Sequence, residues 1–86
     1  MYTAKVRIWD LFVMGYSHSG PNHQHVSASA VAMSRSPKKA VRQAKLLAWR
    51  EFDRKAPRSY YNNIGEPPSV TLYKDGVVIS DTDFPR

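Results

Sequence analysis

The 86 residues include thirteen lysines and arginines against seven acids, which gives a formal net charge of +6, and they include no cysteine. A chain of this length forms one domain, residues 1–86, and buries only about 60–65% of its unfolded surface, so a large cofactor cleft is not expected. The lack of cysteine excludes disulfides and sulfur-ligated zinc and fits a reducing cytoplasm. No stretch has the apolar length of a signal peptide or a membrane span, so a cytoplasmic protein with no membrane partner is expected.

Two strands are predicted in the first third of the chain. Residues 2–14 are rich in β-branched and aromatic residues, but the alternation is clean only up to Ile8, and Asp10 interrupts the inward row. This pattern predicts either a bulge near Trp9 and Asp10 or a strand covered on both faces. Turn-forming residues over 15–24 predict a long loop, and renewed alternation over 25–33 predicts a second strand that pairs with the first.

A single helix is predicted over residues 37–55. Ser36 can cap the first free amides, Pro37 suits the first helical position, and Pro57 ends the helix. Lys38 and Lys39 lie at the positive end of the helix dipole, an unfavourable choice that can mark function. At about 100° per residue one apolar stripe faces the sheet. It consists of Ala40, Val41, Ala44, Leu47, Ala48 and Phe52.

The last third of the chain is predicted as a linker followed by a hairpin. Residues 56–68 form the linker, and Asp75-Gly76 predicts a type I′ turn between two short strands. That turn pairs Leu72 with Ile79 and Lys74 with Val77, and it places Val70, Leu72, Val77 and Ile79 on one face. The tail over 82–86 is expected to fray. The predicted fold is therefore α+β, a four-stranded, mostly antiparallel sheet in β-β-α-β-β order with one helix on one face.

The positive charge is concentrated between Arg35 and Arg58. Nine basic residues lie there against Glu51 and Asp53, a net +7, whereas the rest of the chain sums to −1. Localised positive charge is typical of proteins that bind an anionic partner. Basic side chains and Trp49 follow one another on a helix stripe at spacings of four, three and four, where cations can neutralise phosphates and an indole can stack on a base. The alternative is a solvated face with Trp49 folded onto the linker. The candidate nucleic-acid-binding residues are Lys38, Lys39, Arg42, Lys45, Trp49, Arg50 and Arg54.

A second set of candidates is aromatic and apolar. Tyr60 and Tyr61 are adjacent, so one is expected to pack and the other to be available at an interface, although a pair that anchors the loop is an equal alternative. The outward row of the first strand carries Trp9, Leu11 and Val13 with nothing predicted to cover it. The candidate partner-binding residues are Trp9, Leu11, Tyr60 and Tyr61.

Catalytic and metal sites are not expected. His18, His23 and His25 follow no known zinc-finger or facial-triad spacing, so polar loop residues are the favoured interpretation, although a metal site on these histidines stays open. The carboxylates occupy turn and surface positions, no nucleophile elbow is present, and the four glycines form no phosphate loop. We therefore expect no enzyme, no catalytic residue and no cofactor.

Two functional hypotheses follow. The first is a small basic binding protein that engages nucleic acid, or a nucleoprotein complex, through the basic helix face. The second is an inhibitor or adaptor that binds an acidic protein surface, of the kind with which phages and mobile elements block host defence or transcription; it rests on an analogy of size and fold. A homodimer formed through the exposed first strand also stays open.

Overall fold

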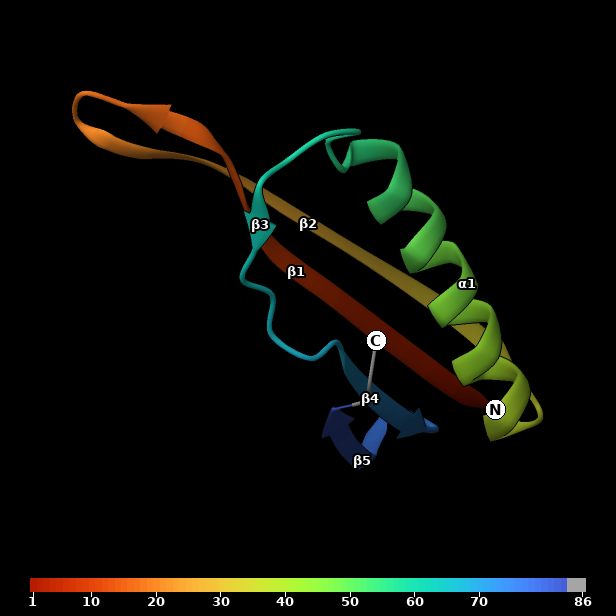
Figure 1. Ribbon diagram of the computed structural model, residues 1–86. Coiled ribbons are helices and arrows are strands. Elements are labelled where there is room, and N and C mark those ends of the chain that lie inside the picture. Colours follow the sequence, from red (N-terminus) through yellow and green to blue (C-terminus); the bar gives the residue numbers. More distant parts are fainter. Residues whose placement is uncertain (84–86) are drawn as a thin grey trace.

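The computed structural model describes residues 1–83, which form one antiparallel sheet with a helix on one face (Figure 1). The elements are β1 (Tyr2–Ser17), β2 (Gly20–Ser34), α1 (Pro37–Lys55), β3 (Asn62–Asn63), β4 (Ser69–Lys74) and β5 (Val77–Asp83). The strand order is β2-β1-β4-β5, and β3 pairs with β1 beyond the end of β4. The predicted α+β class is confirmed, with a fifth, two-residue strand inside the segment predicted as a linker.

Strands β1 and β2 form a long hairpin whose arms stay paired to the turn. The ladder runs from Tyr2 opposite Ser34 to Ser17 opposite Gly20, so the predicted long loop over 15–24 is wrong. Gly20 has a φ of +113°, which favours glycine, and Pro21 lies in an edge strand, where a missing N–H breaks no ladder bond. The turn-forming residues therefore serve one tight turn.

The irregularity of β1 lies further along than predicted. Trp9 and Asp10 pair in regular register with β2, and the shift falls between Val13 and Gly15. Only one face of β1 is covered by a helix in residues 1–83, although Val13 of the outward row is buried and Trp9 and Leu11 are half-buried. Strand β1 is moreover central, with β2 on one edge and β3 and β4 on the other, so it has no free edge over 2–7 for the self-pairing that the sequence left open.

The core lies between α1 and the inward rows of β1, β2 and β4. Alanines at every fourth helix position let the helix lie close to the sheet. Leu47, however, is 43% exposed, because it lies on the flank of α1 toward β2 rather than over the sheet. The buried apolar cluster is Ala4, Val6, Ile8, Phe12, Val26, Ala28, Ala40, Ala44, Ala48, Phe52 and Val70.

The β4–β5 hairpin turns as predicted but pairs differently. Asp75 and Gly76 both have positive φ, 50° and 85°, as a type I′ turn requires, and Lys74 pairs with Val77. Leu72 pairs with Ser80 instead of Ile79, because the register shifts between Leu72 and Tyr73. As a result, the apolar side chains of β5 are exposed and do not join the core. Residues 82 and 83, expected to fray, pair with β4, and the rest of that tail, 84–86, lies outside the described residues.

Candidate nucleic-acid interface

A groove lies between the N-terminal half of α1 and strand β4. It has a volume of about 450 Å³. Three cations and three apolar residues line it: Lys38, Arg42 and Lys45, with Pro37, Val41 and Leu72. Apolar surface beside a row of cations can take a sugar or a base while the cations hold the phosphates on either side.

The helix period places these cations on one flank. The buried positions Ala40, Ala44 and Ala48 point at the sheet, and residues at i, i+4 and i+7 from Lys38 follow one another about 100–160° around the helix from that direction. Strand β4 lies on this side of β1, so Leu72 meets the helix flank across the groove. The stripe predicted from the sequence is therefore a real surface, and Leu72 is the lining residue that periodicity alone does not reveal.

The cations of α1 differ in how far their charge is already compensated. At the C-terminal end the Arg54 Nε donates to Glu51 Oε2 at 3.2 Å, and the Lys55 Nζ lies 3.6 Å from Glu51 Oε1. The hydrogen bond from Arg54 lowers the pKa of Glu51, and the charges of Arg54 and Lys55 lower it further. Within residues 1–83 no ion pair involves Lys38, Lys39 or Arg42. The uncompensated charge is therefore strongest at the N-terminal half of the helix.

The other residues predicted for nucleic-acid binding lie outside the groove. Lys39 and Arg50 are exposed elsewhere on α1, and Arg54 is engaged with Glu51. Trp49 is half-buried, and its ring meets Phe52 edge-on at a centroid distance of 5.5 Å. The indole thus packs against the core at the end of the stripe, in contact with Phe52 of its own helix.

The linker tyrosines take different environments. The Tyr60 ring lies 4.6 Å from the Phe12 ring, edge-on, whereas Tyr61 is largely exposed and contacts Tyr16 at 5.6 Å between centroids. Backbone bonds fix this segment, since the Tyr61 N–H donates to the Val13 carbonyl at 2.8 Å. Tyr16 was not singled out from the sequence, because it falls in the predicted loop. The sequence carries no signal for its position, because the register shift between Val13 and Gly15 changes the alternation of the strand just before Tyr16.

Trp9 and Leu11 lie on the opposite face of the sheet from α1. The Trp9 ring contacts the His25 ring at 5.1 Å, and Leu11 is paired with His25. Since Tyr60 packs with Phe12 in the layer between sheet and helix, the four residues predicted as one partner-binding set do not form one surface.

The histidines are spread along the hairpin. His18 is in the turn, His23 lies opposite Val13 and His25 opposite Leu11. No group of three His, Cys, Asp or Glu side chains in residues 1–83 is arranged to hold a metal ion. Over the same residues, no helix combines the length and the apolar character needed to cross a bilayer.

Comparisons with protein-family models, with curated proteins and with solved structures find no match. The function is therefore argued from the geometry.

Proposed function

We propose that this protein is a small, non-enzymatic module that binds nucleic acid, free or in a nucleoprotein complex, through the groove between α1 and β4. Lys38 and Arg42 on the rim supply contacts to the phosphate backbone, and Val41 and Leu72 supply apolar surface for a sugar or base. The proposal rests on Lys38 and Arg42, which form no ion pair within residues 1–83, lying beside an apolar lining in one groove.

The local electrostatics favour an anion at this place. Ser36 caps the helix by accepting from the Lys39 N–H at 3.4 Å, and no acidic residue occupies the first turn. Lys38 and Lys39 therefore add positive charge where the helix dipole is already positive, and a phosphate relieves that repulsion when it binds. Backbone contacts of this kind carry little sequence information, so binding with weak sequence preference is expected.

Fluorescence anisotropy of labelled single- and double-stranded DNA and RNA tests the proposal. If the segment neutralises about four phosphates, log K should fall against log salt with a slope of about −3 to −4. The double variant Lys38→Glu/Arg42→Glu should abolish binding at physiological salt. Its matched control is Lys5→Glu/Arg7→Glu, which changes the net charge equally on the sheet face away from α1.

The two double variants distinguish binding at the groove from electrostatic attraction that depends only on the net charge of the protein. Retained binding in Lys5→Glu/Arg7→Glu supports the groove, while equal losses would mean that only net charge matters. No binding by the unsubstituted protein at low salt would overturn the proposal. A cytoplasmic location, where nucleic acids are accessible, belongs to the same proposal.

One observation favours a second candidate function, an inhibitor or adaptor that binds an acidic protein. Tyr16 and Tyr61 form an exposed aromatic pair beside the long hairpin, and tyrosine is enriched at protein interfaces. On this alternative, which includes a phage-like accessory role, Tyr61→Ala should break a protein complex while nucleic-acid affinity survives. The Trp9→Ala variant tests a protein contact on the outer face of the sheet in the same way, since it should also break the complex and leave nucleic-acid affinity unchanged.

A further inference from the structure

Strand β2 has one edge bonded to β1, and within residues 1–83 no strand lies beside the other (Figure 1). Proteins protect an exposed sheet edge with charges, prolines, bulges or a covering element. The fifteen residues of β2 include no Lys, Arg, Asp or Glu, and the irregularity of the hairpin lies in β1. Pro21 occurs only at the far end of β2, next to the turn. The half of β2 near α1 therefore has an edge without the usual protection.

Hydrogen bonds identify the backbone groups at this edge. The carbonyls of Leu11 and Val13 accept from the linker, on the side of β1 away from β2. In an antiparallel ladder the N–H and C=O of one residue point to the same side, and successive residues alternate. The even-numbered residues of β1 therefore bond to their even-numbered partners in β2, and Ser29, Val31 and Met33 direct their N–H and C=O groups outward.

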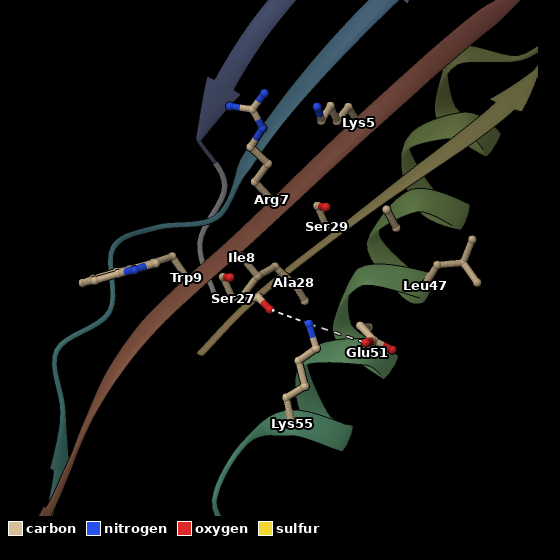
Figure 2. A pocket seen from close by; sticks show the side chains of 11 residues that line it. Lys5, Arg7, Ile8, Trp9, Ser27, Ala28, Ser29, Leu47, Glu51 and Lys55 are labelled. Atoms are coloured by element: carbon tan, nitrogen blue, oxygen red, sulfur yellow. Dashed lines mark hydrogen bonds and ion pairs between the residues drawn. The ribbon is translucent and has the colours of Figure 1, made fainter. Parts of the chain in front are cut away.

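One point of the edge is covered by α1. The Lys55 Nζ donates to the Ser27 carbonyl at 3.1 Å, as Figure 2 shows, which agrees with an outward direction for this odd-numbered residue. A hollow of about 720 Å³ runs around the strand at this point, with Leu47, Glu51 and Lys55 on its helix side. Beyond Ser27, the outward residues Ser29, Val31 and Met33 are all exposed.

Apolar side chains flank the open part of the edge on both sides of the sheet. Val31 is 54% and Met33 61% exposed on the outer face, and the half-exposed Leu47 overhangs from the helix side. The opposite edge of the sheet, β5, differs, because it carries Asp81 and Asp83 and contains a register shift. Of the two edge strands in residues 1–83, only β2 combines outward backbone groups with flanking apolar surface and no charge.

We propose that β2 pairs antiparallel with β2 of a second copy of this chain, across a two-fold axis at Val31. Val31 then lies opposite the partner's Val31, and Ser29 lies opposite the partner's Met33. A strand without charges can pair with itself because no like charges come face to face, and a two-fold interface uses the same patch twice. Centring the pairing on Val31 also leaves the bond between Lys55 and Ser27 outside the paired segment.

The dimer has a defined arrangement of layers. A two-fold axis perpendicular to the joined sheet places both helices on the same face, with their Leu47 flanks toward each other. The groove with Lys38 and Arg42 lies on the other flank of α1, toward β4, so it stays open in the dimer. Dimerisation is therefore independent of the proposed nucleic-acid binding, and either can fail without the other.

Sedimentation equilibrium over about a hundredfold range of concentration tests the dimer. Val31→Lys places a charge at the two-fold axis and should weaken the dimer by at least about tenfold. Val78→Lys is the matched control, because Val78 is 53% exposed and lies on the β5 edge, and it should dimerise as the unsubstituted protein does. A monomer at every concentration, or equal behaviour of the two variants, would overturn the proposal.

Disulfide trapping is a second test that does not depend on the stability of a charged variant. The chain has no cysteine, so Val31→Cys introduces a single thiol. Residues that exchange ladder hydrogen bonds have Cα atoms about 5.5 Å apart, within the range a disulfide spans. Oxidised Val31→Cys should form a covalent dimer much faster than Val78→Cys, and similar rates would contradict pairing through β2.

Discussion

The side-chain amide of Asn63 donates to the carboxylate of Asp10 at 3.0 Å, across 53 positions of the chain. Asp10 is 1% exposed and also accepts from the Leu11 N–H at 2.8 Å. A carboxylate in the inward row of β1 is costly unless its oxygens are hydrogen-bonded. The linker supplies one of these bonds, and the Ile64 N–H adds a backbone bond to the Leu11 carbonyl. Asp10 thus explains both the break in the hydrophobic pattern and the position of β3.

Asn63→Ala should therefore destabilise the fold. Removing a donor to a buried charged group costs about 1–3 kcal/mol of unfolding free energy. Urea denaturation followed by circular dichroism measures the loss. Asn22→Ala, at an exposed position of β2, is the matched control and should be within about 0.5 kcal/mol of the unsubstituted protein. Equal stability of the two variants would mean that the linker does not depend on Asp10.

Ala44→Leu should be destabilising for a different reason. Ala44 is completely buried between α1 and the sheet, and added carbons in a tightly packed interface force backbone shifts that cost about 1–3 kcal/mol. The reverse change at an exposed helix position, Leu46→Ala, should be nearly neutral, since Ala is the better helix former. Thermal denaturation of both variants tests whether the alanine row sets the distance of the helix from the sheet.

Local signals in the sequence predicted α1 and the β4–β5 turn well. Ser36-Pro37 and Pro57 bound the helix that the structure contains, and Asp75-Gly76 has the backbone angles of the predicted turn. The errors concern one partner distant in sequence and the register and length of two hairpins. The strand β3 is an Asn-Asn pair without strand propensity, held by Asp10, and the register of β5 depends on a shift that no residue pattern announces.

The candidate site was likewise predictable where it depends on local sequence and not where it depends on strand pairing. Helical periodicity placed Lys38, Arg42 and Lys45 on one stripe, and the structure puts all three along one groove. The contribution of Leu72 depends on β4 being next to β1, which strand order decides and periodicity does not. The free edge of β2 was likewise hidden, because the sequence does not show which strands are central.

The ion pairs of Glu51 have a measurable pH signature. The Arg54 hydrogen bond, together with the charges of Arg54 and Lys55, holds the pKa of Glu51 below its usual 4.5. A lowered pKa means that the stabilisation is complete above about pH 4.5 and is lost as the pH falls through the lower folded value. In a carboxyl NMR titration, Arg54→Ala should raise the pKa of Glu51 more than Lys55→Ala does. The opposite order would make Lys55 the main partner.

Lys38→Glu should separate stability from binding. A carboxylate in the first turn interacts favourably with the helix dipole, and removing the lysine relieves its repulsion from Lys39, so the unfolding free energy should rise by about 0.3–1 kcal/mol. The same variant should bind nucleic acid more weakly, because it loses a rim cation of the groove. Lys5→Glu, outside the helix, should gain no dipole stabilisation and should keep most of the binding. Denaturation and anisotropy on the same preparations give both quantities. A Lys38→Glu protein that is more stable and binds as tightly as before would show that this lysine serves neither fold nor nucleic acid.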